Sequence, residues 1–367
     1  MRRAVAVTAL AAALALGAPA GAGAIEAGEK IWIHGYGNWS YGVTNGNVYQ
    51  SGTDEGNYDN LEFSLSVAAE PVERTSIHAQ IFVEKDAEGS NASVDYAFAE
   101  YAFDPALKFR IGAVKQPFGI FTEIFDVGTV YPFVDLAQGI YGPAGFVSEH
   151  FLGAAFTGRL PFGSGWQLQY DLYGGDMESA YATPWEAAAE GEAGEASTDI
   201  QNMIGGRILL TTPDQSLTCG LSAYTGTEDT KTFGETDESH RHTAYGAQAE
   251  YFVGPATLRA EYAGQQTEIA SSNAAYAEAA WRLTPNWQLA ARYDWSKTSL
   301  DEDGGIDDNL LKHQDIGVAV DYFFSPNFVL KLAVHQVTGN RFANVDDEAA
   351  TPKEKTTLVT FGTSFSF

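Results

Sequence analysis

Apolar and polar residues alternate along most of the chain. From residue 31 onward, segments of about 8 to 13 residues follow a period of two. In one of them Ile316, Val318 and Val320 share one face, while Asp315 and Asp321 lie on the other. Successive side chains of a strand point to opposite sides, so this pattern predicts strands with one apolar and one polar face.

The connections between these segments alternate in length. Seven short links contain proline, most often beside Gly, Asp or Asn, as tight turns require: 71–76, 104–106, 161–165, 212–216, 254–255, 284–286 and 325–327. Eight longer polar links lie between them: 44–60, 85–93, 115–146, 174–201, 225–242, 267–273, 297–313 and 338–355. Fifteen connections imply sixteen strands. An even number of strands, with short turns at one rim and long loops at the other, is typical of an outer-membrane β-barrel.

Aromatic residues flank the short links, where they are expected to form an interfacial girdle. They are Phe103, Trp166, Tyr251, Trp281, Trp287, Phe324 and Phe328. We therefore predict an all-β fold, a 16-stranded antiparallel transmembrane β-barrel with short periplasmic turns and long extracellular loops. Clustering of aromatics near turns also occurs in ordinary hydrophobic cores, but their position at one rim favours the girdle.

The composition narrows the function. Asp and Glu number 48 against 21 Lys and Arg in 367 residues, which gives a net charge of -27 and argues against nucleic-acid binding. A single cysteine excludes a disulfide framework and a cysteine-based zinc site. No G-x-S-x-G or H-E-x-x-H motif is present, so we do not expect an enzyme, and we expect no cofactor.

The N-terminal residues have the pattern of a secretory signal. Arg2 and Arg3 precede an apolar stretch from Ala4 to Leu16, and small residues follow at 22–24. The apolar stretch is too short to span a bilayer. We expect residues 1–24 to be a signal peptide and residues 25–367 to form the barrel.

The last strand alternates and closes on Phe367, which is similar to the assembly signal of outer-membrane barrels. The mature chain resembles the Gram-negative porins. A shorter segment resembles porins related to the phosphate-selective group: Ile111-Gly112-Ala113-Val114-Lys115-Gln116-Pro117-Phe118-Gly119. The resemblance implies a channel in the bacterial outer membrane, usually a homotrimer, whose third loop folds inward. The partners it implies are outer-membrane lipid, lipopolysaccharide, the barrel-assembly machinery and small solutes or ions.

The third long link, 115–146, carries seven aromatic residues that need a surface to pack against: Phe118, Phe121, Phe125, Tyr131, Phe133, Tyr141 and Phe146. We expect it to fold into the lumen and to form a constriction with Lys115, Glu123, Asp126 and Asp135. Basic residues on the polar faces of the strands would supply the pore wall: Lys108, Arg110, Arg207, Arg259, Arg282 and Arg292. We expect Arg259, Arg282 and Arg292 to face the loop acids, because opposed rows of charge sort solutes.

Several alternatives remain at this stage. The wall charges can be a solvated, salt-bridged surface, and the loop acids can simply cap turns. The acidic stretch with Asp301, Asp303, Asp307 and Asp308 suits Ca²⁺ only weakly, because the EF-hand spacing is absent. We expect a passive diffusion channel for small hydrophilic solutes or ions, with a weak preference for cations. The alternative is a structural, adhesion or receptor barrel that acts through its acidic extracellular loops.

Overall fold

The computed structural model describes residues 25–28, 30–49, 51–85, 89–142, 146–179, 197–232, 235–268, 270–301, 306–344 and 353–367. The expected signal peptide at 1–24 lies outside these ranges. The helices within them are short: η1 (Thr122–Ile124), η2 (Gly128–Val130), α2 (Gln138–Tyr141) and η3 (Asp308–Leu311). No helix in the described ranges is long and apolar enough to cross a bilayer.

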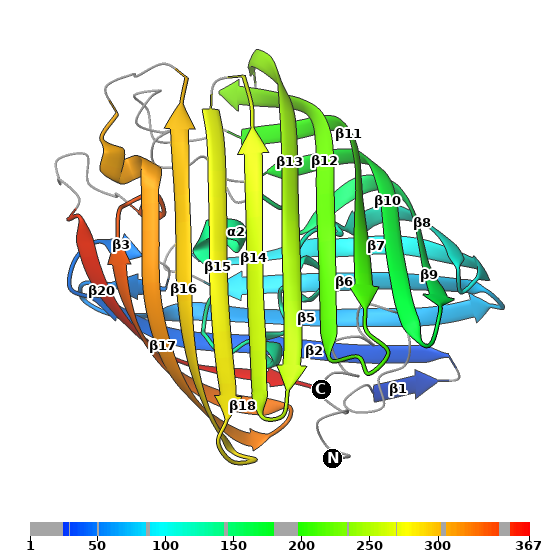
Figure 1. The fold of residues 1–367 in the computed structure, drawn as a ribbon, viewed down its shortest axis with the longest axis horizontal. Helices are drawn as coiled ribbons and strands as arrows, with labels where there is room; N and C mark the ends of the chain where they lie inside the picture. The colour runs from blue at the N-terminus through cyan, green and yellow to red at the C-terminus, as the bar shows by residue number, and fades with distance from the viewer. Residues whose placement is uncertain are drawn as a thin grey trace.

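Long antiparallel strands make up most of the described chain (Figure 1). They are β2 (Ile31–Thr44), β5 (Asn57–Val72), β6 (Thr75–Lys85), β7 (Ser90–Asp104), β8 (Leu107–Lys115), β9 (His150–Phe162), β10 (Trp166–Ser179), β11 (Ser197–Thr211), β12 (Leu217–Thr232), β13 (Glu235–Val253), β14 (Ala256–Gln266), β15 (Ala270–Arg282), β16 (Trp287–Leu300), β17 (Lys312–Ser325), β18 (Phe328–Thr338) and β20 (Lys355–Ser366). Four shorter strands accompany them: β1 (Ile25–Gly28), β3 (Val48–Tyr49), β4 (Gly52–Thr53) and β19 (Ala343–Asn344).

The long strands close into a barrel. Each pairs with the next, and β20 pairs with β2 from Tyr36↔Ser366 to Thr44↔Leu358. Among the described residues this gives sixteen barrel strands, as the alternation of short and long links predicts. In Figure 1 the short turns of β13 to β18 lie at the lower margin of the barrel, and those that follow β5 and β7 lie at its right-hand margin.

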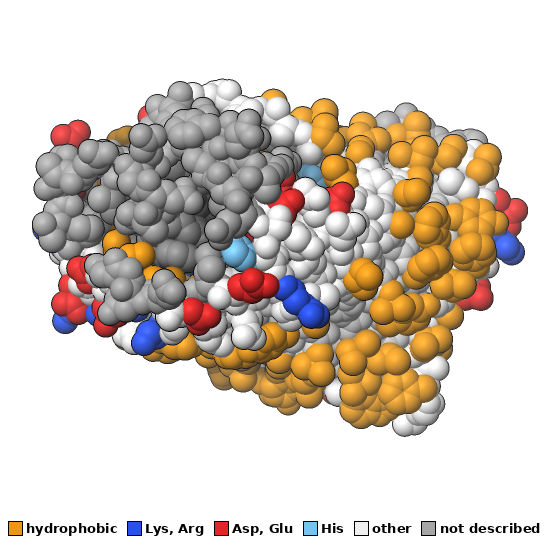
Figure 2. Space-filling model, turned by 90° about the horizontal axis from the view of Figure 1, so that it is seen from above, with side chains coloured by type: hydrophobic (Ala, Val, Ile, Leu, Met, Phe, Trp, Pro, Cys, Tyr) orange, Lys and Arg blue, Asp and Glu red, His pale blue; other side chains and the backbone are white. Residues whose placement is uncertain are grey.

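The two faces of the wall differ as the sequence pattern predicts. On β17 the outward Ile316 and Val318 are 59% and 54% exposed, whereas the inward Asp315 and Asp321 are buried. Hydrophobic side chains accordingly gather over the right and lower flanks of the barrel in Figure 2. An apolar outer surface and a polar interior suit a barrel surrounded by lipid.

One predicted connection is much shorter than expected. The link predicted at 225–242 belongs mostly to strands, because β12 continues to Thr232 and β13 begins at Glu235. These extensions pair residue by residue, for example Glu228↔His240. The segment is strongly polar, so its alternation carries no apolar face, and the sequence pattern does not distinguish a strand that extends beyond the lipid from a loop.

Glycines on β2 make room for aromatic rings where the barrel closes. The backbones of Gly35 and Phe367 exchange two hydrogen bonds, of 3.1 and 3.0 Å. A Cβ atom on Gly35 would lie 2.2 Å from the Phe367 ring, and one on Gly37 would lie 2.3 Å from the Phe365 ring. An aromatic ring over a strand glycine is a device that pins strand register. The closing seam therefore depends on a glycine and an aromatic residue from opposite ends of the chain.

We predict that Phe367→Ser lowers the amount of folded barrel, because it removes both the ring over Gly35 and the terminal aromatic residue. The measurement is the fraction of heat-modifiable, folded protein in isolated outer membranes. Ser366→Ala serves as the control, since it changes the neighbouring residue without touching a ring. An undiminished folded fraction in Phe367→Ser would contradict a role for this residue in assembly.

Candidate functional site: the third loop and the inner wall

The third loop, defined here as the connection between β8 and β9, carries η1, η2 and α2. Figure 1 shows α2 behind β14 and β15, inside the outline of the barrel. The aromatic side chains of the loop are mostly covered: Phe118, Phe121, Tyr131, Phe133, Tyr141 and Phe146 are buried, and Phe125 is partly buried. They pack with inward side chains of the wall, such as Tyr224 on β12 and Tyr276 on β15. Removing these aromatic side chains from water stabilises the position of the loop against the wall.

Cations of the wall hold the backbone of the loop. The Lys331 ammonium donates to the carbonyls of Gly128 and Phe133, at 2.7 Å each. The Arg292 guanidinium donates to the carbonyl of Asp135 at 2.9 Å. Arg259, on β14, donates to the carbonyl of Val130 at 3.1 Å. All three basic side chains are buried beneath the loop, so each bond satisfies a charge that is shielded from water.

Carboxylates of the wall hold other parts of the same loop. Glu261 on β14 accepts the backbone N–H of Ile120 at 2.7 Å and the hydroxyl of Tyr141 at 2.5 Å. Asp294 on β16 accepts the backbone N–H of Gly139 at 3.0 Å, at the start of α2. The loop thus finds acceptors for its N–H groups as well as donors for its carbonyls, which lets irregular backbone lie inside a barrel.

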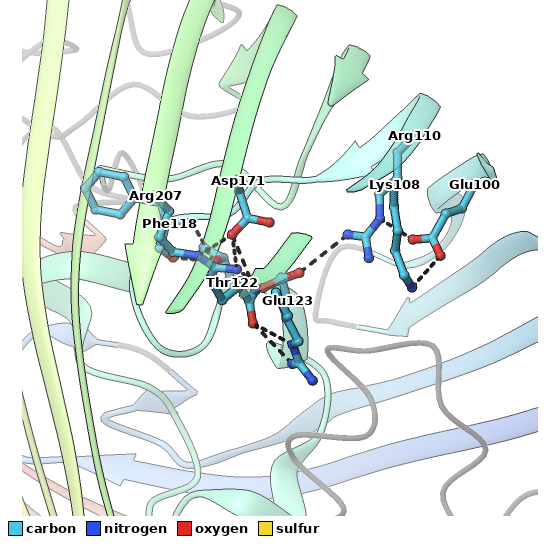
Figure 3. A network of polar contacts seen from close by, with 10 residues as sticks. Glu100, Lys108, Arg110, Phe118, Thr122, Glu123, Asp171 and Arg207 are labelled. Carbon is cyan, nitrogen blue, oxygen red and sulfur yellow. Dashed lines mark hydrogen bonds and ion pairs between the residues drawn. The ribbon is translucent and has the colours of Figure 1, made fainter. Parts of the chain in front are cut away.

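Glu123 joins the loop to the wall of β8 to β11 through a network of ion pairs (Figure 3). Its carboxylate is 2.5 Å from Arg207, which also contacts Asp171 at 3.0 Å. Arg110 lies 3.9 Å from Glu123 on the other side. Glu100 continues the network, with Arg110 at 2.8 Å and Lys108 at 2.7 Å.

Lys115 ends β8 among three carboxylates. Its ammonium is 2.7 Å from Asp95, 3.7 Å from Asp126 and 3.7 Å from Glu149. A β-bulge places Asp95 here, because Gln80 pairs with Tyr96 while the next residue, Ile81, pairs with Val94. The extra residue is left free to point inward.

Asp126, Asp95 and Glu149 are the described acidic residues close enough together to hold a metal ion. The Lys115 ammonium already serves as their counter-ion. The amide of Gln80 donates to both Asp95 and Asp126 at 2.5 Å. Burial raises the pKa of the Asp126 carboxyl, and the charge of Lys115 opposes that rise. The cluster is therefore explained as an ion-pair network.

The predicted partners of the loop acids differ from those observed. Glu123 meets Arg207 and Arg110, and Asp126 meets Lys115, instead of the row on β14 to β16. Arg259 and Arg292 do contact the loop, but through its carbonyl oxygens. Arg282 lies away from the loop acids, 3.7 Å from the centre of the Phe323 ring. Side-chain charge alone does not determine these partners, because a folded-in loop must also satisfy its backbone carbonyl groups.

Several contact residues were missing from the predicted site. Lys331, Glu261 and Asp294 occupy inward positions, and the period-two pattern identifies them only as wall. Asp95 could not be placed, because no sequence signal marks the bulge. Among the weak Ca²⁺ candidates, Asp303 lies outside the described residues, and Asp307 caps η3 by accepting the N–H of Asn309 at 2.9 Å. Among the described residues, Asp301, Asp307 and Asp308 do not form a group close enough to hold a cation.

Two recesses flank the third loop on the side of β2 and β5 to β8. We call one the acidic recess; its charged lining residues are Glu62, Glu84, Lys85, Asp135 and Lys331. The other, the aromatic recess, has the ring side chains Tyr36, His78, Tyr96 and Phe98 and the charged residues Arg110, Lys115, Glu123 and Asp126. Asn38 lies between them and donates to Glu62 at 3.1 Å and to the Asp126 carbonyl at 3.4 Å.

Comparison with solved structures supports the same architecture. The outer-membrane channel DcaP of Acinetobacter baumannii superposes with a TM-score of 0.63 at 10% identity, covering 94% of this chain and 100% of that one. An anion-selective porin from Comamonas acidovorans superposes with a TM-score of 0.58 at 14% identity, covering 92% of this chain and 99% of that one. The trimer form of OmpT from Vibrio cholerae superposes with a TM-score of 0.56 at 11% identity, covering 92% of this chain and 99% of that one. At these identities the likeness establishes the fold.

Sequence comparison supplies the family. No protein with a curated description matches the chain. The family described as phosphate-selective porin O and P matches residues 79–367, which include β7 to β20 and the third loop. Taken with the closed barrel, its apolar outer face and its polar interior, this match shows that the chain belongs to the phosphate-selective porin O and P family and is a porin of the bacterial outer membrane.

Proposed function

We propose that this porin is a passive diffusion channel for small hydrophilic solutes or ions, constricted by its third loop. The observation that carries the proposal is the attachment of the loop to β8, β11, β14, β16 and β18, with charged recesses beside it. Transport through such a pore follows concentration and potential, without bond chemistry or a cofactor.

The attachment supports a fixed constriction. Arg259, Arg292 and Lys331 are buried and bonded to loop carbonyls, so they are not available to bind solute. Selectivity then depends on the charges that line the recesses. In the acidic recess Lys331 is engaged with the loop, and Lys85 is paired with Asp59. Glu62, Glu84 and Asp135 therefore give this side of the pore a preference for cations.

We do not extend phosphate selectivity, which the family name describes, to this chain. Such selectivity needs basic groups that are accessible to a phosphate ion. In the third loop region Lys115 is buried and surrounded by Asp95, Asp126 and Glu149. An anion approaching Lys115 would meet more negative than positive charge.

An enzymatic role receives no support from the two buried His–Asp pairs. His313 lies 3.3 Å from Asp294, and His335 lies 2.8 Å from Asp315. The imidazoles are 0% and 1% exposed, so a substrate cannot reach them. A role in adhesion through the acidic extracellular loops is the second candidate, and the charged recesses inside the barrel favour transport over it.

We further propose a homotrimer in the outer membrane, with lipid and lipopolysaccharide around it and the barrel-assembly machinery as the partner during insertion. The apolar outer face supports contact with lipid. The Vibrio cholerae OmpT structure described as a trimer form supports the oligomeric state by analogy.

Replacing residues 126–141 by a short Gly–Ser linker should raise single-channel conductance, because this part of the loop occupies the lumen in the proposed pore. It should also favour anions, since Arg292 and Lys331 would become exposed to water. Both effects can be measured in planar bilayers. Deleting the equally long segment 181–196 is the control. Unchanged conductance in the 126–141 variant would contradict the constriction.

The variant Glu62→Gln/Glu84→Gln/Asp135→Asn should move the reversal potential in a salt gradient toward the anion value. The shift should be larger in dilute salt, because the Debye length falls from about 30 Å at 0.01 M to about 3 Å at 1 M. The control variant Glu70→Gln/Glu73→Gln changes acids near the periplasmic turn. An identical reversal potential in the wild-type protein and the triple variant would exclude the acidic recess from the ion path.

The variant Arg207→Met should destabilise the barrel by about 3 kcal/mol, because it leaves Glu123 and Asp171 buried without their cation. Adding Glu123→Gln should recover part of the loss. Urea unfolding in lipid vesicles measures both. Arg159→Met is the matched control, since that guanidinium donates to Gln169 instead of a carboxylate. Equal stability of the two arginine variants would rule out the ion-pair network as the attachment of η1.

A further inference from the structure

Aromatic rings interrupt the polar inner face on β6 and β7. Phe98 lies between the outward residues Ala97 and Ala99, so its ring belongs to the inward face, where the neighbouring inward residue is Glu100. Tyr96 lies two residues before Phe98 on the same face. His78, on β6, is the register partner of Phe98. All three rings line the aromatic recess. Apolar rings that border water cost free energy, so their position here calls for an explanation beyond the barrel pattern.

The three rings form a cluster, called the platform below, in which the Tyr96 ring is inclined to the Phe98 ring by 41°. The His78 and Phe98 rings are stacked, with centres 4.9 Å apart and planes at 18°. The Tyr96 ring is 5.9 Å from that of Phe98. On the other side of Phe98, its register partner is Gly112, which adds no side chain. His78, Tyr96 and Phe98 are only half-buried, so the third loop does not cover them fully.

Charged groups border this platform, and each of them is paired within the protein. The recess is lined by two cations, Arg110 and Lys115, and by two anions, Glu123 and Asp126. The Arg110 guanidinium also lies 5.3 Å from the centre of the Phe98 ring. A free ion would gain little from charges that already have partners of opposite sign. A neutral solute with many hydroxyl groups can donate to the carboxylates and accept from the cations.

From this combination we propose that His78, Tyr96 and Phe98 form a binding site for neutral carbohydrate on the solute path. One face of a pyranose ring presents C–H groups and packs on aromatic rings, while its hydroxyl groups meet the paired charged groups at the edge of the platform. Pockets that orient small molecules combine apolar surface with a few polar groups in this way. The inference rests on the proposed passage beside the third loop, and it assigns that passage a solute class.

Ion current through the wild-type porin in planar bilayers tests the site, with glucose as the probe. Sorbitol, an acyclic polyol of similar size, is the matched solute without a ring. We expect glucose to reduce the current in a saturable manner and sorbitol to reduce it only as a viscous additive. Block by benzoate without block by glucose would overturn the proposal, because it would assign the rings to aromatic anions.

The variants Phe98→Ala and His78→Ala should each raise the glucose concentration for half-block, Phe98→Ala by roughly tenfold. Phe98→Tyr should retain block, since it keeps the ring. Phe109→Ala is the matched control, because Phe109 contacts Phe156 on the neighbouring strand and does not line the recess. Heat-modifiability confirms that each variant is folded.

Equal half-block concentrations in folded wild-type protein and both ring variants would overturn the site, because the rings would then only pack against the third loop. The current without sugar separates this result from a failure of the proposed channel. If the pore conducts but glucose does not block it, only the carbohydrate site is contradicted. If the barrel does not conduct, the proposed function is contradicted as well.

Discussion

The position of the third loop inside the barrel depends on hydrogen bonds between buried cations of the wall and carbonyl groups of the loop. A long segment without regular structure carries many backbone groups that need partners, and the interior of a barrel has no sheet edge to offer them. Lys331, Arg292 and Arg259 supply donors, while Glu261 and Asp294 supply acceptors. Without these five side chains the loop would have to remain hydrated, and the lumen would be wider.

This use of charge changes the meaning of a basic residue in the lumen. A lysine that satisfies two carbonyls contributes to the position of the loop, and its field is largely compensated locally. In the proposed channel, the residues that remain for solute are those beside the loop, where the acidic and aromatic recesses lie. The selectivity of such a pore therefore cannot be obtained by adding the charges of all inward residues.

The sequence predicts the barrel well, because one rule, apolar out and polar in, applies to every strand. It also places Glu123 and Asp126 in the loop and Arg207 on the inward face of β11. It does not predict which of these residues meet, because that depends on the path of the loop backbone. Asp95 shows the limit clearly: a single bulged residue turns it inward, and the alternation of β7 contains no sign of the shift. The alternation also does not predict the extensions of β12 and β13, since strands above the lipid lose their apolar face.

The seam between Gly35 and Phe367 has a consequence for the order of folding. It joins residues more than three hundred positions apart, and contacts of such large sequence separation are slow to form because the chain between them must first be ordered. Until the seam closes, β2 and β20 each present an open edge, which is the feature that promotes pairing with other chains. Before closure the ring of Phe367 lacks its contact with Gly35, and after closure it covers Gly35. A terminal aromatic residue of this kind can serve as a recognition element only while the barrel is incomplete, so closure itself would end the encounter with an assembly factor.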